Sequence, residues 1–329
     1  MFDVRSLHLP PYRGLIAAAY DHPETTSALG DLSGLLHSPS VETLQSGRNK
    51  IVAVRLPAAA TDSPSGMMPA SLDAVIKIFG ARGFHKLKTI LLPSKGVRAW
   101  HGAVALRGDG FETPGPIAVL ERRRFGVVVE SVFVAERIHG GREIRALFHE
   151  IPESDLRGLI EALAPVLARL HDAGLVHRDL SDGNVLVFSD ENPSTLPHSD
   201  GQVSLKIPSV FPPLSSALPK IGSGLGPTAQ TTSPPPSSTG FHFCFLDTNR
   251  VRRRRNLGAF GRARNLVRLG VPPPLRPFFL DRYIRAAGAS FSSSRFEFYY
   301  RTAKRSFELW LAFKKKIRLR AIARKLRLQ

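Results

Sequence analysis

One stretch of thirteen residues constrains the fold of this 329-residue chain more than any other. It runs from Leu175 to Val187 and reads LVHRDLSDGNVLV, a polar loop that opens into an apolar strand. Before it, residues 156–170 place apolar side chains at steps of three and four, the period of a buried helix face. Gly174 favours the end of that helix, because glycine readily adopts the left-handed conformation that closes a helix. The sequence therefore predicts a helix, a polar loop and a strand in this order.

The polar loop has the form H-R-D-L-x-x-x-N, which is typical of the catalytic loop of protein-kinase-like phosphotransferases. In such a loop the aspartate, here Asp179, reaches the hydroxyl that accepts the phosphoryl group. The asparagine five residues later, here Asn184, turns back to a magnesium ion on the ATP phosphates. The helix and the strand on either side agree with this interpretation, so ATP and Mg are the predicted cofactors.

Two segments upstream are predicted to contact the nucleotide. Residues 44–55 look like two strand segments around a turn with Gly47, where a kinase covers the ATP phosphates with backbone amides. Only one glycine is present, so an ordinary hairpin explains the pattern equally well. Residues 74–79 read AVIKIF, close to the V-A-I-K strand, and Lys77 is expected to reach the α- and β-phosphates. The alternative for Lys77 is a strand lysine that faces solvent.

The glutamate that normally pairs with this lysine is missing. A kinase helix after the lysine strand carries a glutamate for the purpose, yet no glutamate occurs between Lys77 and Phe111. Three possibilities remain open from the sequence. Lys77 is held by Asp247, by an acidic residue elsewhere, or by none.

Two more segments complete the predicted site. Residues 113–121 and 125–130 read as two strands across a basic turn, and the second ends at Glu130, where the hinge between two lobes is expected. Residues 241–247, FHFCFLD, form an apolar strand that ends in Asp247, the place of the second magnesium ligand. A structural aspartate that caps the strand end is the alternative for Asp247.

The predicted site residues fall into three groups. The expected catalytic residues are Asp179, Asn184 and Asp247, the cofactor-binding residues are Lys77, Gly47 and Glu130, and the metal ligands are Asn184 and Asp247.

Composition narrows the class of protein. A single cysteine, Cys244, excludes an internal disulfide, and its apolar neighbours indicate a buried strand thiol. Residues 1–14 lack the basic start and apolar core of a secretory signal, and no run approaches ~18 apolar residues, so no membrane-spanning helix is expected. A cytoplasmic chain is the expectation.

Positive charge is concentrated in the last quarter of the chain. Residues 251–329 hold 22 Lys and Arg against 3 Asp and Glu, so they carry the whole formal net charge of +19. Such a block indicates an anionic partner.

Arg252–Arg255 are hypothesised to meet phosphate or carboxylate groups of the acceptor, with a solvated basic loop as the equal alternative. The residues from about 301 predict a basic amphipathic helix that contacts an anionic membrane surface. Nucleic acid is not expected as a partner, since no nucleic-acid fold signature accompanies the charge.

These motifs together resemble the bacterial lipopolysaccharide-core kinases, the Kdo/WaaP family. The resemblance rests on HRDLSDGN, the later F-x-L-D-x-N-R, and the segments NLVRLG at 265–270 and FLDRY at 279–283. It also includes Arg98–Trp100 and residues 110–116, and it covers about residues 44–283 except for a Ser/Pro-rich segment at about 190–240. The resemblance implies an enzyme that uses ATP and magnesium to phosphorylate Kdo or heptose of the lipopolysaccharide inner core, at the cytoplasmic face of the inner membrane.

The predicted fold is α+β, a two-lobed protein-kinase-like fold with a β-rich N-lobe and a mainly helical C-lobe. Residues 1–40 are expected to be a loosely structured lead-in, 41–130 the N-lobe, 131–300 the C-lobe and 301–329 the basic helix. A Ser/Pro-rich flexible insertion is expected at about 190–240.

The predicted function is transfer of the ATP γ-phosphate to a sugar hydroxyl, with a phosphorylated glycolipid as the partner. An atypical protein Ser/Thr kinase and a membrane-associated pseudokinase scaffold are the alternatives.

Overall fold

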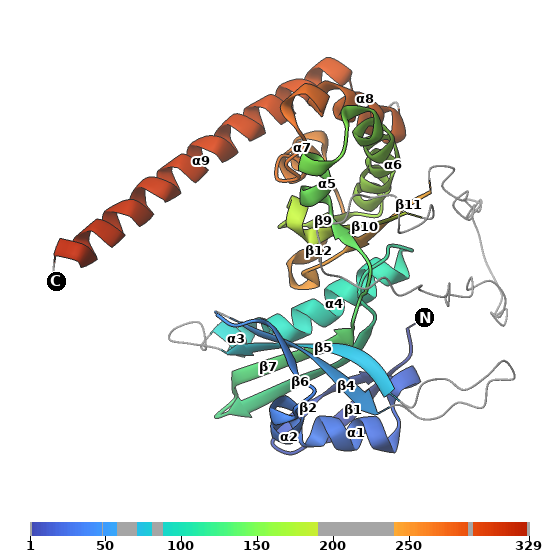
Figure 1. The fold of residues 1–329 in the computed structure, drawn as a ribbon, viewed down its shortest axis with the longest axis vertical. Coiled ribbons are helices and arrows are strands. Elements are labelled where there is room, and N and C mark those ends of the chain that lie inside the picture. Colours follow the sequence, from blue (N-terminus) through green and yellow to red (C-terminus); the bar gives the residue numbers. More distant parts are fainter. Residues whose placement is uncertain are drawn as a thin grey trace, which may run out of the picture.

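The computed structural model describes residues 2–47, 49–57, 71–80, 88–189, 240–288 and 292–327. They form two lobes, one below the other in Figure 1. The lower, N-terminal lobe is built on one large sheet, and the upper, C-terminal lobe is mainly helical. The predicted α+β, two-lobed kinase-like class is therefore confirmed. The expected insertion at about 190–240 lies outside the described residues, apart from Gly240.

The N-lobe contains a seven-stranded antiparallel sheet with the order β1-β2-β6-β7-β5-β4-β3. The strands are β1 (Val4–Leu9), β2 (Tyr12–Ala17), β3 (Glu42–Gln45), β4 (Lys50–Pro57), β5 (Ser71–Gly80), β6 (Pro116–Arg124) and β7 (Val127–Glu136). The helices of this lobe are α1 (Pro23–Gly30), α2 (Leu32–His37), α3 (Lys88–Leu91) and α4 (Lys95–Gly108).

The two faces of the sheet are covered by different helices. Leu29 of α1 and Leu32 of α2 share a buried cluster with Ile76 of β5. Trp100 of α4 shares a second buried cluster with Phe79 of the same strand. Since alternate strand residues point to opposite faces, α4 covers the face that carries Phe79. Figure 1 shows α4 between the sheet and the C-lobe, so this face looks toward the other lobe.

The expectation that residues 1–40 are a loosely structured lead-in is wrong for most of that stretch. Strands β1 and β2 pair with each other, and β2 pairs with β6, so they extend the sheet on one side. Leu7 is the one buried side chain of β1. An edge strand with so little apolar pattern gives a weak sequence signal, which explains why the strand was not predicted.

The C-lobe contains both short strands and longer helices. The strands are β8 (Arg142–Glu143), β9 (Leu175–His177), β10 (Val185–Ser189), β11 (Phe241–Phe245) and β12 (Val251–Arg253), and the helices are α5 (Ile144–Glu150), α6 (Glu153–Asp172), α7 (Ala259–Leu266), α8 (Arg276–Ala286) and α9 (Ser293–Arg327). The predicted helix before the HRD motif is α6, and its apolar residues, Leu159, Ile160, Leu163 and Leu167 among them, are fully buried. Cys244 lies buried in β11, where burial raises the pKa of its thiol to about 12.

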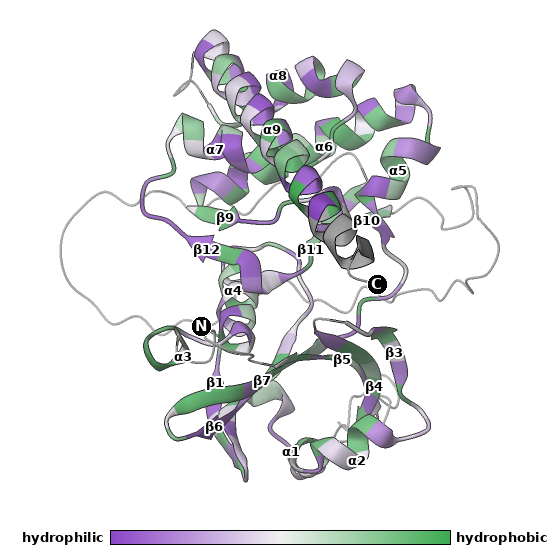
Figure 2. Cartoon of the chain, turned by 90° about the vertical axis from the view of Figure 1, so that its left-hand side faces the viewer, coloured by the Kyte–Doolittle hydropathy of each residue, from purple (hydrophilic) through white to green (hydrophobic). Residues whose placement is uncertain are grey.

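Helix α9 begins at Ser293, earlier than the predicted 301, because its first turns pack on the C-lobe through Phe296 and Tyr300. Beyond these turns it leaves the lobe and runs outward (Figure 1), with purple and green segments mixed along it (Figure 2). Among the described helices, none is long and apolar enough to cross a membrane.

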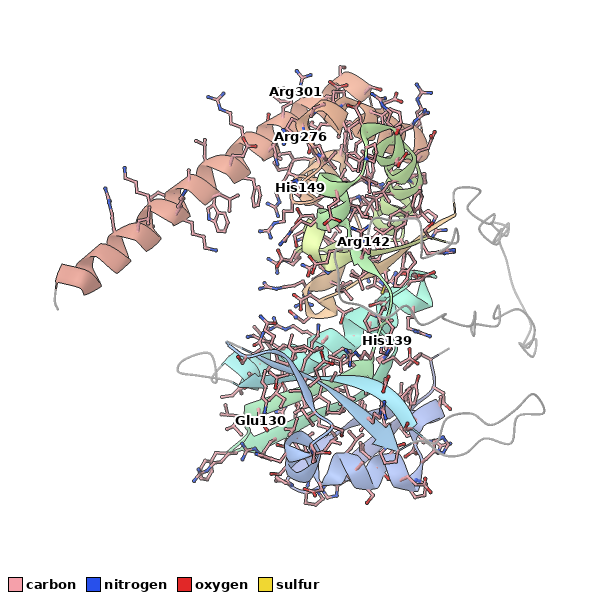
Figure 3. The ribbon with its side chains drawn as sticks, in the orientation of Figure 1. Glu130, His139, Arg142, His149, Arg276 and Arg301 are labelled. Atoms are coloured by element: carbon pink, nitrogen blue, oxygen red, sulfur yellow. The ribbon has the colours of Figure 1, made fainter. Side chains whose placement is uncertain are left out.

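The hinge between the lobes lies later than predicted. Strand β7 continues through Glu130, which pairs with Gly80 of β5, and ends at Glu136. The chain then reaches β8 of the C-lobe by residue 142. In Figure 3, Glu130 lies within the N-lobe sheet, whereas His139 lies where the two lobes are joined. The prediction of a hinge at Glu130 is therefore wrong, because an apolar strand pattern does not reveal where the chain leaves the sheet.

Candidate active site

The HRD loop, residues 177–184, lies between β9 and β10, and Asp247 follows directly after the neighbouring strand β11. Strands β10 and β11 pair antiparallel, with Val185 opposite Phe245. The pairing continues one step further, because the Leu246 amide donates to the Asn184 carbonyl oxygen at 2.9 Å. This register brings the two predicted metal ligands to the same edge of the C-lobe sheet, although 63 positions separate them in the sequence.

Asp179 occupies a position fixed by its own loop. Its backbone carbonyl oxygen accepts hydrogen bonds from the Ser181 amide at 2.7 Å and from Asn184 Nδ2 at 2.8 Å. These bonds leave the carboxylate to project from the loop, where it is about one-third exposed. Its Oδ1 atom accepts a hydrogen bond from Arg268 Nη1 at 2.5 Å.

Asn184 is oriented by two hydrogen bonds from the same amide nitrogen. Nδ2 donates to the Asp179 carbonyl oxygen and to Ser181 Oγ at 3.0 Å. With the nitrogen used in this way, the amide oxygen Oδ1 is the atom available as a ligand. A hard cation such as Mg²⁺ prefers oxygen ligands of this kind.

Asp247 has a left-handed backbone, with φ 51° and ψ 49°. A short 3-10 helix, Thr248–Arg250, follows it, and Asn249 Nδ2 donates to Asp247 Oδ1 at 2.5 Å. Arg250 Nε lies 4.0 Å from Oδ2. A left-handed non-glycine residue is uncommon and marks a tight change of direction, which here turns the chain out of β11 directly beside the HRD loop.

Lys77 lies in β5 on the same face as Phe79, the face that looks toward the C-lobe. Burial lowers the pKa of its amine, and the charge of Asp247 opposes that effect. Helix α4 carries no glutamate that could hold the lysine. Of the three possibilities left open by the sequence, the structure supports Asp247 as the acidic group that acts on Lys77.

The remaining two predicted cofactor residues differ in their placement. Gly47 lies in the turn between β3 and β4, and the space around its Cα is open. The predicted hairpin is confirmed there. Glu130 accepts a hydrogen bond from Tyr12 at 2.5 Å and lies 3.9 Å from Arg122, both within the N-lobe sheet. Its side chain is engaged in the sheet and is not at the hinge.

A buried chain of polar side chains supports the HRD loop from behind. His177 Nε2 donates to the Leu246 carbonyl oxygen at 2.7 Å, and Asn265 Nδ2 donates to the His177 carbonyl oxygen at 2.7 Å. His171 Nε2 donates to Asn265 Oδ1 at 2.9 Å, so its Nδ1 accepts from the Tyr283 hydroxyl at 2.7 Å. Burial lowers the pKa of His171 to about 4 and also lowers that of His177. Neutral imidazoles therefore hold the loop in register with the segment that carries Asp247.

Sequence reasoning missed Arg268, the ion-pair partner of Asp179. Arg268 follows α7, and its guanidinium also lies over the Phe307 ring of α9 at 5.1 Å. Lys304 of α9 donates to the Val267 carbonyl oxygen at 3.3 Å. The segment NLVRLG was noted in the sequence as a family feature, but 89 positions separate Arg268 from Asp179, and no local pattern reveals such a contact.

Residues 87–196 match the model of the "Lipopolysaccharide kinase (Kdo/WaaP) family", and the matched region includes α4, β6, β7, α6 and the HRD loop. A solved structure, "WaaP in complex with acyl carrier protein", is similar at 16% identity over 82% of this chain and 88% of that chain, with a TM-score of 0.45. No curated relative matches in sequence.

The two-lobed fold and the matched region define an ATP-dependent phosphotransferase. The match over residues 87–196 agrees with the resemblance to the Kdo/WaaP family inferred from the motifs.

Proposed function

We propose that this kinase transfers the γ-phosphate of ATP to a hydroxyl of a Kdo or heptose sugar in the lipopolysaccharide inner core. The observation that carries the proposal is the pairing of β10 with β11, which brings Asn184 and Asp247 together beside Asp179. The family match over the same loop supports a sugar acceptor in place of a protein.

In the proposed reaction the sugar hydroxyl oxygen attacks the γ-phosphorus, the bond to the bridging oxygen breaks, and ADP leaves. Asp179 orients the hydroxyl and receives its proton as the new phosphorus–oxygen bond forms. General-base assistance of this kind contributes on the order of 10²- to 10⁴-fold. The loop hydrogen bonds that fix the Asp179 backbone support this role, since catalysis by positioning requires a rigid group.

Asn184 and Asp247 are the proposed magnesium ligands. They supply an amide oxygen and a carboxylate, and the described residues contain no cluster of three or more His, Cys, Asp or Glu that could hold a metal alone. Magnesium in phosphoryl-transfer sites is commonly bound by one or two protein groups together with substrate phosphates, so this ligand set fits. The ion would neutralise charge on the ATP phosphates.

Lys77 and Gly47 are proposed to bind the ATP phosphates from the N-lobe. The amine of Lys77 lies on the face toward the C-lobe, where burial lowers its pKa and the charge of Asp247 opposes that effect, which suits a group that contacts the α- and β-phosphates. The open space around Gly47 allows a phosphate to approach the hairpin backbone closely. Glu130 is not proposed as an adenine contact, because it lies within the sheet.

Arg268 is proposed as a positioning residue for Asp179. Protein Ser/Thr kinases usually have a lysine at the position of Ser181, and that cation is missing here. The guanidinium of Arg268 places a positive charge at the same carboxylate, 2.5 Å from Oδ1.

Arg253, one of the arginines expected to meet the acceptor, instead pairs with Asp109 at 2.6 Å, whereas Arg254 and Arg255 are exposed.

The outer part of α9 is proposed to contact an anionic membrane surface, as a peripheral protein at the cytoplasmic face of the inner membrane. Exposed apolar side chains stand on both sides of a run of three lysines there, Lys314–Lys316: Leu309, Trp310, Leu311 and Phe313 come before the run, and Ile317 and Leu319 come after it. A basic helix with apolar side chains is the pattern of an interfacial anchor. Such an anchor would bring the site to a glycolipid acceptor.

The acceptor can be tested by offering the purified kinase two glycolipids, one ending in Kdo and one extended with heptose, with labelled ATP. Label recovered on either sugar supports the proposal and identifies the acceptor. Label on neither sugar, together with label on a general protein substrate, would overturn it in favour of an atypical protein kinase.

A further inference from the structure

A second concave site lies on the C-lobe side of α4, apart from the proposed ATP phosphates. It is a pocket of about 500 Å³ between α4, the start of the HRD loop and β12. The polar side chains that line it are all basic: Arg98, His101, Arg178, Arg252 and Arg253. No aspartate or glutamate lines the pocket among the described residues.

The fold itself forces these arginines together. Strand β12 pairs with β9, so Arg252 lies opposite Val176, and the Arg178 amide donates to the Arg250 carbonyl oxygen at 3.0 Å. Helix α4 approaches from the N-lobe, where a Cβ on Gly102 would lie 2.0 Å from the Thr248 carbonyl oxygen. Thr248 also donates from Oγ1 to the Ala99 carbonyl oxygen at 2.8 Å. The close contact leaves Arg98 facing the arginines of the C-lobe.

Three of these guanidinium groups lack a carboxylate partner within the described part of the chain. Arg253 pairs with Asp109, but no salt bridge joins Arg98, Arg178 or Arg252 to an acidic side chain of the described ranges. Among the residues that the structure describes, Arg252 is hydrogen-bonded only to backbone carbonyl oxygens, and Arg98 Nε is buried without a hydrogen-bond partner.

The electrostatics agree with an uncompensated cluster. Burial lowers the pKa of Arg98, and the charges of Arg250 and Arg178 lower it further. Burial lowers the pKa of Arg252 as well, followed by the charges of Arg98, Arg178 and Arg250. Holding like charges together in a half-buried pocket destabilises the fold unless a counter-ion enters.

We propose that this pocket binds a phosphate group, held by Arg98, Arg178 and Arg252. Guanidinium groups match phosphate oxygens in a bidentate manner, and several of them converge here without competition from a carboxylate. The bound group joins α4 of the N-lobe to Arg178, the neighbour of Asp179, and to the strand after Asp247. Occupancy of the pocket therefore stabilises the contact between α4 and the C-lobe.

The phosphate can be a free ion or a group on a phosphorylated glycolipid, and the same arginine–phosphate hydrogen bonds would hold it in either case. The first experiment uses inorganic phosphate alone, without ATP or acceptor, so its result does not depend on the proposed transfer reaction. Calorimetric titration of the full chain at constant ionic strength is expected to give one saturable site. Arg98→Gln is expected to weaken the affinity at least about tenfold, the loss of one charge-assisted hydrogen bond.

Arg285→Gln is the matched control, because this exposed arginine pairs with Asp281 on α8, outside the pocket. Its affinity for phosphate is expected to equal that of the wild type. Equal affinity for the wild type and Arg98→Gln, or binding that never saturates, would overturn the proposal and indicate only general attraction to a basic surface.

Thermal stability gives a second readout that survives a folding defect in one variant. Without phosphate, Arg98→Gln and Arg252→Gln are expected to melt at or above the wild-type temperature, because each removes a like charge. At a phosphate concentration near the wild-type Kd, the wild type and Arg285→Gln should gain more stability than either pocket variant. The proposal would be contradicted if both pocket variants had a lower melting temperature than the wild type and if phosphate still raised their melting temperatures as it does for the wild type.

The source of the phosphate is decided by a competition. The wild type with bound inorganic phosphate is offered a glycolipid that carries phosphate monoesters, and separately its dephosphorylated form. If only the phosphorylated glycolipid displaces inorganic phosphate, the pocket binds the acceptor. Displacement by neither glycolipid, with inorganic phosphate still bound at one site, assigns it to free phosphate.

Discussion

Arg268 and Asp179 form an ion pair across 89 positions of sequence, with Arg268 Nη1 2.5 Å from Asp179 Oδ1. The same guanidinium lies over the ring of Phe307 in α9. The carboxylate at the centre of the proposed chemistry is thus connected, through one arginine, to the helix proposed to lie at the membrane. Both Asp179 and Arg268 remain about one-third exposed, so a substrate can reach them.

Loss of Arg268 should impair turnover more than nucleotide binding. In Arg268→Gln the carboxylate loses its charged partner, and a misplaced catalytic group typically costs on the order of 10²-fold. We expect kcat to fall by roughly 10- to 100-fold while the KM for ATP changes little. Partial recovery in Arg268→Lys would distinguish a positioning charge from a purely structural role, and equal loss in both variants would argue against the role of charge.

Lys77→Met should weaken ATP binding. The side chain keeps its length but loses the ammonium that is proposed to contact the phosphates, so affinity should fall at least about tenfold. Titration of ATP by fluorescence or calorimetry measures this change. Arg5→Met removes a positive charge from the edge strand β1, where Arg5 pairs with Asp21, and should leave the affinity unchanged. If both variants bind ATP as the wild type does, Lys77 does not contact the ATP phosphates.

Stability should decline as the pH falls below about 6.5, in part because of His171. Burial lowers the pKa of His171 to about 4 in the folded chain, against about 6.5 when unfolded. Between these values the unfolded chain binds the extra proton, so the free energy of unfolding falls as pH decreases. At pH 5 this amounts to about 2 kcal/mol. His177 acts in the same direction, because its pKa is also lowered.

Denaturant unfolding at pH 7 and pH 5 measures the effect. His171→Gln keeps a donor toward Asn265 but cannot titrate, so the difference between the two pH values should shrink by about the amount stated. An unchanged difference would mean that His171 is already protonated in the folded chain.

Neutralising the lysine run of α9 should abolish attachment to anionic vesicles without affecting chemistry. Each Lys near such a surface contributes on the order of 1 kcal/mol, so replacing Lys314, Lys315 and Lys316 by Gln should reduce partitioning by about 100-fold. Sedimentation with vesicles of anionic and of neutral lipids measures it. Turnover of a detergent-dispersed acceptor should stay near the wild-type rate. Unaltered partitioning would exclude α9 as the anchor.

The sequence allowed prediction of the parts of the site that depend on local pattern. Helix α6 with its apolar face, the HRD loop and the strand that ends in Asp247 all have clear periods or spacings. The hinge was misplaced because β7 is apolar well beyond Glu130. Strand β1 was missed because it is an edge strand with one buried side chain, and β2 was missed because only Ile16 and Ala17 at its end are buried. The contacts of Arg268 and the arginine pocket arise from tertiary packing, which no local pattern encodes.

Transfer of labelled phosphate from Mg-ATP to a purified lipid A–core acceptor, by the wild type beside Asp179→Asn, tests the central claim most directly. Asp281→Asn, which removes an exposed carboxylate on α8, serves as the control. We predict label on the glycolipid with the wild type and the control, and a 10²- to 10⁴-fold lower rate with Asp179→Asn at nearly unchanged ATP affinity. Equal rates for all three proteins would remove Asp179 from the mechanism and contradict this account.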